Sequence, residues 1–309
     1  MIIKAIAVAS IFWLLPVPTA FLLKMTDRKM SCLYGYIVGA LLNLLAFHVT
    51  NRILFVSGAT LGMMHIGILL SVNALILFAS GIIWLVKGRK LSKKAVKDES
   101  DENKAVANRI WWWSVSVVLG ISVLGSYLFY VPNNATVLMA AINRLDYFPM
   151  VPGESMMSMG YYLVKLLNFT PAYAVCVVIP FMFCMPVLVL FWIMTDMMDD
   201  AKNKVVFLCA ELILLFLGDG QFTYSGLVLH GLNQITNISI VLCVPLAFIL
   251  SFRIFVQKKR GPVWLLVFDL VAACLLWRTT AFVSFACVVL CALIYAGRRY
   301  LPWFQPSQQ

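Results

Sequence analysis

The sequence predicts an all-α fold: a polytopic transmembrane bundle of about nine helices, with one or two interfacial amphipathic helices beside it. Three observations lead to this prediction. Of the 309 residues, 62% are hydrophobic and only 12% are charged, whereas about a quarter of a soluble domain is charged. Apolar runs of roughly 20 residues, enough to cross a bilayer as a helix, recur along the whole chain. The runs are continuous, which favours helices over the alternating strands of a membrane barrel.

Residues 1–86 are expected to form an N-terminal segment of three spans. The first runs from Ala5 to Leu23, and the prolines at 16 and 18 are expected to kink it. The second runs from Leu33 to Thr50, and the third from about Leu61 to Val86. Between the second and third spans we expect a short turn, formed by Asn51, Arg52 and the small residues Ser57, Gly58 and Gly62.

A hydrophilic segment at 87–109, KGRKLSKKAVKDESDENKAVANR, follows the third span. Its high charge cannot be buried in lipid, so we expect an exposed cytoplasmic linker. It divides the chain from the main transmembrane domain at 110–309. That domain opens with Trp111, Trp112 and Trp113, and an aromatic cluster beside a basic linker is typical of a membrane-interface anchor.

The main domain is expected to contain four clear spans and two shorter apolar runs. The four spans are Ile110–Tyr130, Ala172–Met194, Val205–Leu217 and Ile235–Phe255. The shorter runs, Val263–Trp277 and Thr280–Ala296, form either two spans or a re-entrant pair. Helical periodicity predicts amphipathic, interfacial helices over Ala135–Leu145 and Met156–Phe169.

The basic residues define a topology. Nine spans alternate without conflict if all but five of the 24 basic residues lie in cytoplasmic segments, the five being Lys4, Arg52, Arg144, Lys165 and Arg278. The protein is then expected in the plasma membrane, with its N-terminus outside and its C-terminus in the cytoplasm. Because the net charge of +11 gathers at the ends of apolar runs, it indicates this sidedness and not nucleic-acid binding. The expected partners are membrane lipids and a further protein in the membrane.

Two polar excursions, 131–160 and 218–234, then lie on the outer face and hold most candidate site residues. In the first excursion, Asp146 and Glu154 are candidates for a catalytic acid and base or for ligands of a divalent cation; alternatively they are solvated loop charges beside Arg144. Asn133 and Asn134 could contact a substrate headgroup or cap the following helix.

The second excursion contains Asp219, flanked by Gly218 and Gly220, which is a candidate substrate contact or a turn residue. Two further acids, Glu211 and Asp269, fall at membrane depth, where a charge costs roughly 2.5–3.5 kcal/mol. Such groups face a partner, a cavity or water. Arg278 could pair with Asp269 or bind an anionic lipid phosphate, and a proton relay is a further alternative. The three histidines are scattered and predict no metal site.

One stretch resembles a known family: YVPNNATVLMAAINRLDYFPMVPGESMMSMGYYLVKLLN, with the downstream pieces NFTPAYAVCVVIPFMFCMPVLVLFW and FLGDGQFTYSGLVLHGLNQITNISIVLCVPLAF. It is similar to an uncharacterised bacterial family of multi-pass proteins that look like C-type glycosyltransferases. The resemblance implies an inverting transferase that takes a sugar from a polyprenyl phosphate at the outer face.

The resemblance also implies a departure at the acidic motif. Such enzymes use an Asp or Glu of an early outer loop as base or metal contact, and the matching positions here hold Asn133 and Asn134. Either Asp146 or Glu154 substitutes, with Arg144 and Arg278 as phosphate contacts, or this copy no longer catalyses. The alternative from another class is a non-catalytic membrane subunit or a transporter, in which Glu211 and Asp269 are packing or transport groups.

The predicted sidedness can be tested with cysteines introduced at Asn134 and Asp219 in a chain whose native cysteines are replaced. Both should react with a membrane-impermeant maleimide in intact cells, because both excursions are predicted on the outer face. If either cysteine reacts only after the membrane is permeabilised, the proposed pocket does not exist.

Overall fold

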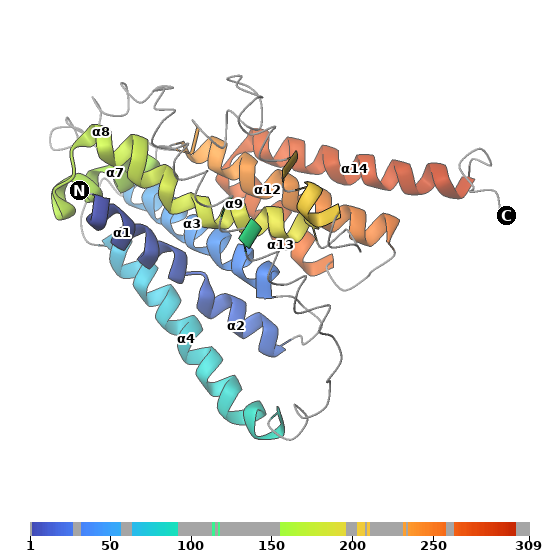
Figure 1. Ribbon diagram of the computed structural model, residues 1–309, viewed down its shortest axis with the longest axis horizontal. Helices are drawn as coiled ribbons and strands as arrows, with labels where there is room; N and C mark the ends of the chain where they lie inside the picture. Colours follow the sequence, from blue (N-terminus) through green and yellow to red (C-terminus); the bar gives the residue numbers. More distant parts are fainter. Residues whose placement is uncertain are drawn as a thin grey trace. The chain divides into compact units, whose positions relative to one another are not determined.

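The computed structural model describes residues 2–26, 32–56, 64–91, 155–195, 203–207, 209–210, 231–232, 234–257 and 263–300, together with residues 113, 114 and 117. All regular structure in these ranges is helical (Figure 1). The chain divides into two compact units, Met1–Ile238 and Ser239–Gln309.

The all-helical membrane class predicted from the sequence is confirmed. Among the described residues, six helical segments are long and apolar enough to cross a bilayer, namely Ile3–Met25, Cys32–Ile53, Gly67–Val86, Pro171–Thr195, Ile235–Val256 and Arg278–Gly297. The predicted spans at 110–130 and 205–217 lie mostly outside the described ranges, and the apolar helix Val263–Leu276 is shorter than a span. The count of about nine spans therefore stays a prediction.

The first predicted span is broken where its prolines indicated. Helix α1 (Ile2–Leu14) ends at a turn through Leu15 and Pro16, and α2 (Val17–Thr26) follows at once. A proline inside a helix removes one N–H and clashes with the preceding turn, so the break frees backbone carbonyls near the end of α1.

Trp13, near this break, connects three helices. Its indole Nε1 donates to the carbonyls of Met182 at 3.1 Å and Phe181 at 3.3 Å, both in α9 (Ile179–Thr195). Its own carbonyl accepts a hydrogen bond of 2.9 Å from the hydroxyl of Tyr36 in α3 (Cys32–Val56). The Met182 carbonyl is available because Pro186, four residues later, has no N–H to donate. Trp13 thus satisfies a carbonyl that has no water to bond inside a membrane.

Two glycines allow α2 and α3 to approach closely. A Cβ at Gly35 would lie 2.7 Å from the Cα of Ala20, and one at Gly39 would lie 2.7 Å from the carbonyl oxygen of Pro16. Glycines four residues apart in a membrane helix provide such backbone contact, which replaces the hydrophobic driving force that lipid cannot supply.

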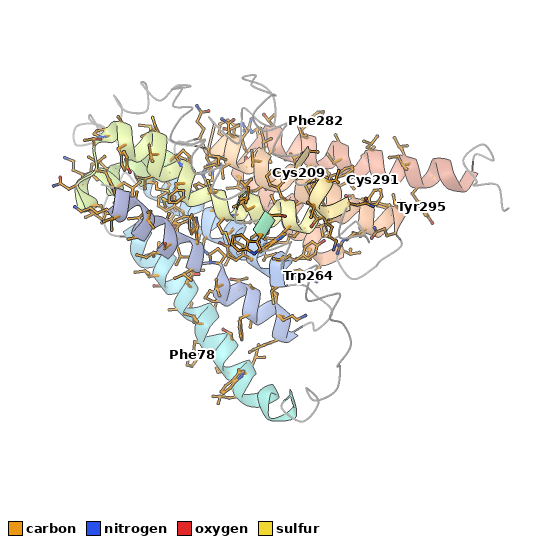
Figure 2. All side chains as sticks on the ribbon, viewed as in Figure 1. Phe78, Cys209, Trp264, Phe282, Cys291 and Tyr295 are labelled. Carbon is orange, nitrogen blue, oxygen red and sulfur yellow. The ribbon has the colours of Figure 1, made fainter. Side chains whose placement is uncertain are left out.

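Helix α4 (Met64–Leu91) packs on α3 through a reciprocal amide pair. The side chains of Asn43 and Asn73 hydrogen-bond to each other. Each amide also donates a hydrogen bond of 2.8 Å to a carbonyl of its own helix, Asn43 to Gly39 and Asn73 to Leu69. The other side of α4 is apolar and exposed. Phe78, which is 70% exposed, projects from α4 (Figure 2). A patch of this kind would aggregate in water, but it suits a lipid-facing helix.

The turn predicted at Asn51 and Arg52 is wrong, because α3 continues to Val56 and includes both residues. Apolar residues from Ile53 to Val56 extend the run by another turn. In addition, the side-chain oxygen of Asn51 accepts a hydrogen bond from Ser158 and does not cap the end of the helix.

The segment after residue 154 is a helix followed by a span that begins with a π-helical turn. Helix α7 (Ser155–Leu167) ends at Asn168, whose φ of 60° is left-handed and whose N–H bonds the Val164 carbonyl. After α8 (Pro171–Tyr173), a π-helical turn η1 (Ala174–Val178) leads into the deeply buried α9. Much of α7 is buried too, through residues such as Met156 and Tyr162. Its predicted interfacial position stays a prediction.

The second unit contains most of α12 (Ile235–Ser251), the π-helical turn η2 (Phe252–Val256), α13 (Val263–Leu276) and α14 (Arg278–Tyr300). Helices α12 and α14 run in the same direction, and α13, which connects them in the chain, packs against α14 (Figure 1). Whether α13 and α14 are two spans or a re-entrant pair stays a prediction.

Replacing Gly35 or Gly39 by alanine should destabilise the protein by about 1–3 kcal/mol, because each new methyl group would meet backbone atoms that cannot yield easily. Unfolding in a detergent titration would measure the loss. Gly81→Ala is the matched control, since no described atom lies within 4 Å of a Cβ there. Equal stability of all three variants would contradict the close contact.

Candidate functional site

The first group of buried polar side chains connects α3 to α7. His48 Nδ1 and Ser155 Oγ are 2.6 Å apart, and Ser158 Oγ donates to Asn51 Oδ1 at 2.7 Å. All four side chains are buried. Because residues three apart in a helix lie on one face, two positions in each helix can pair like successive rungs. We call these four residues the polar ladder.

The ladder has polar atoms that its own bonds leave unsatisfied. His48 Nε2 and Asn51 Nδ2 are buried and have no hydrogen-bond partner among the described residues. A buried group without a partner costs about 1–3 kcal/mol. Next to Asn51, Arg52 is exposed and lies close enough to His48 for its charge to act on the ring.

A serine hydroxyl at 2.6 Å from an imidazole also has the geometry of a nucleophile beside its base. Such a pair requires substrate access and a third group that orients the imidazole. Ser155 is completely buried, and His48 Nε2 lacks an orienting partner in the described part of the chain. The arrangement therefore favours a structural role, in which side-chain hydrogen bonds hold two membrane helices in register.

Most residues predicted as site residues lie outside the part of the chain that the structure describes. These are Asn133, Asn134, Arg144, Asp146, Glu154, Asp219 and Glu211. Their proposed roles stay predictions. The two that are described are Arg278, exposed at the first position of α14, and Asp269, completely buried in α13.

Asp269 is the second buried polar feature. Neither of its carboxylate oxygens has a hydrogen-bond partner of normal geometry among the described residues, so no hydrogen bond to Arg278 forms. The thiol of Cys243 in α12 is close enough to interact with the carboxyl. A thiol is a weak donor, so this contact satisfies the carboxyl poorly. Of the alternatives considered for Asp269, the pair with Arg278 is thus not formed.

The polar ladder is not among the sites predicted from the sequence. A signal was present, because His48 and Asn51 are polar residues three apart at the end of an apolar run, and Ser155 and Ser158 repeat that spacing. Polar residues at such positions face protein more often than lipid. The pairs nevertheless join residues 107 positions apart, so the tertiary structure is needed to identify them.

Comparison with known proteins identifies no relative: no protein-family model, no curated protein and no solved structure matches the chain.

Replacing Ser155 by alanine should destabilise the protein by about 1–2 kcal/mol, because buried His48 loses its partner. Ser158→Ala should act similarly through Asn51. The control is Ser71→Ala, whose exposed hydroxyl bonds only a carbonyl of its own helix at 2.7 Å. Detergent-induced unfolding provides the measurement. The ladder has no stabilising role if Ser155→Ala lowers the free energy of unfolding by no more than the control does.

Proposed function

We propose that this integral membrane protein binds, or acts on, a lipid-linked sugar at the outer face of the plasma membrane, in the manner of a C-type glycosyltransferase. The resemblance of residues 130–168 and the downstream pieces supports this function. The proposal keeps the predicted orientation, with the N-terminus outside and the C-terminus in the cytoplasm.

The polar ladder is the observation that carries the proposal. It bonds the C-terminal part of α3 to the first turn of α7, and the charge pattern had predicted both of these chain regions on the same outer side. Ser155 directly follows Glu154 in the chain. The ladder thus holds the described end of this excursion, Ser155 to Ser158, against the helix that carries the exposed cation Arg52.

Arg52 provides a positive charge that would bind the phosphate of a polyprenyl-phosphate ligand. A guanidinium binds phosphate oxygens through two parallel hydrogen bonds, and this geometry distinguishes arginine from lysine. In the proposed mechanism, Arg52 and Arg144 hold the phosphate, with Arg278 as a further candidate contact. Asp146 or Glu154 activates the acceptor hydroxyl as a general base or through a divalent cation, and the phosphate departs from the sugar carbon as the acceptor oxygen attacks.

The second candidate function is a non-catalytic membrane subunit or a transporter. The buried carboxyl of Asp269, which lacks a hydrogen-bonded partner in the described part of the chain, favours it, because intramembrane acids commonly mark ion or substrate pathways. The asparagines at 133 and 134, in place of the family's acids, favour it as well.

Binding can be tested with the protein in nanodiscs and decaprenyl phosphate as the probe, measured by native mass spectrometry. Arg52→Gln should weaken binding by about tenfold, which is the loss expected for one charge-assisted hydrogen bond of about 1.4 kcal/mol. Arg52→Lys should restore part of it. Lys165→Gln, which removes an exposed charge near the other end of α7, is the control. Equal binding by all variants would contradict the role of Arg52.

Catalysis is tested separately, with decaprenyl-phosphate-glucose as donor and release of decaprenyl phosphate as the readout. At least one of three single substitutions should abolish turnover, because a general base contributes about 10²–10⁴-fold to the rate. The three are Asp146→Asn, Glu154→Gln and Asp219→Asn. If the wild-type protein binds the donor but does not turn it over, the hypothesis of a non-catalytic subunit replaces the hypothesis of an enzyme. If it neither binds nor turns over the donor, the lipid-sugar proposal fails.

A further inference from the structure

The inner faces of the three helices in the second unit contain a row of buried polar side chains. Ser239 Oγ and Thr280 Oγ1 are 2.6 Å apart and join α12 to α14. Ser284 is one turn beyond Thr280 on α14, and Cys243 is one turn beyond Ser239 on α12. All of these side chains are buried, as is Asp269 on α13.

Two contacts fix the register of α12 and α14. Ser239 in the second turn of α12 meets Thr280 in the first turn of α14, and farther along, the rings of Phe255 and Tyr295 are 6.5 Å apart. The separation in sequence is nearly the same at both contacts, so the two segments run parallel, and Figure 1 shows them in the same direction. Because residues four apart lie on one helix face, Cys243 and Ser284 occupy the next layer after the Ser239–Thr280 pair.

Asp269 belongs to this second layer, because its carboxyl adjoins the thiol of Cys243. Neither Asp269 oxygen has a hydrogen-bond partner of normal geometry in the described ranges, and the hydroxyl of Ser284 has none either. An ionised carboxylate there would be a buried charge without a counter-ion, which is far more costly than a neutral acid. A bound proton removes that charge and is a ligand that needs no cavity.

We propose that Asp269, which is buried on α13 with no hydrogen-bond partner for either carboxylate oxygen among the described residues, is a proton-binding site within the membrane. This inference goes beyond the proposed function and does not depend on it.

Few other titratable groups of the described second unit bear on this acid. Cys243 faces it from α12, and Cys287 and Cys291 lie farther along α14. Arg278 is at the start of α14, and Arg253 is in η2, well beyond Cys243 along α12. Protonation of Asp269 is consequently governed by its burial and by the thiol beside it, and not by an ion pair.

The full-length protein in ether-linked lipids, which have no ester carbonyl, allows the site to be observed by infrared difference spectroscopy. The wild type should show a protonated-carboxyl band that is absent from Asp269→Asn and is present, at a shifted position, in Asp269→Glu. Transfer to D₂O should shift the band as the carboxyl exchanges its hydrogen. Asp269→Glu guards against misfolding as the cause of the lost band.

Two results would overturn the proton site itself. One is a wild-type spectrum identical to that of Asp269→Asn, which would mean an ionised carboxylate. The other is a band that disappears when Na⁺ replaces choline at constant pH, which would assign the site to a metal cation.

Discussion

The interior of a bilayer offers no water to a polar group, so each backbone carbonyl freed by a proline must find a donor within the protein. Trp13 meets this requirement where two proline-containing segments face each other. Its indole bonds the carbonyl that Pro186 leaves without a helical donor, and Tyr36 bonds the carbonyl of Trp13 itself. The rings of Trp13 and Phe181 also pack edge to face, with their centroids 4.9 Å apart. The end of α1 is thereby held against α9.

The same constraint explains how α3 selects its neighbours. Lipid provides no hydrophobic force between helices, so close backbone contact and side-chain hydrogen bonds determine which faces meet. Helix α3 presents Gly35 and Gly39 to α2, Asn43 to α4, and the polar ladder to α7. Each contact is specific, because an alternative rotation of α3 would leave amides or an imidazole facing lipid. Helix α3 is the organising element of the first unit for this reason.

Asp269 differs from those polar residues in a way that bears on function. Asn43, Ser155 and Ser158 are bonded across helix interfaces, as structural groups in membranes are. Asp269 is as deeply buried, but neither of its carboxylate oxygens has a hydrogen-bond partner among the described residues. Because a buried carboxylate without a counter-ion is far more costly than a neutral acid, this group points to an exchangeable ligand.

The sequence alone determined the all-helical membrane class, the kink at Pro16 and the position of most described helices, because helix length and apolar composition are local properties of the chain. It also indicated Asp269 as an intramembrane acid. It could not reveal that α3 extends through Asn51 and Arg52, that His48 meets Ser155, or that Asp269 adjoins Cys243 and not Arg278. Those facts depend on which helix faces meet. That choice is made by contacts between residues far apart in the chain, and only the tertiary structure decides it.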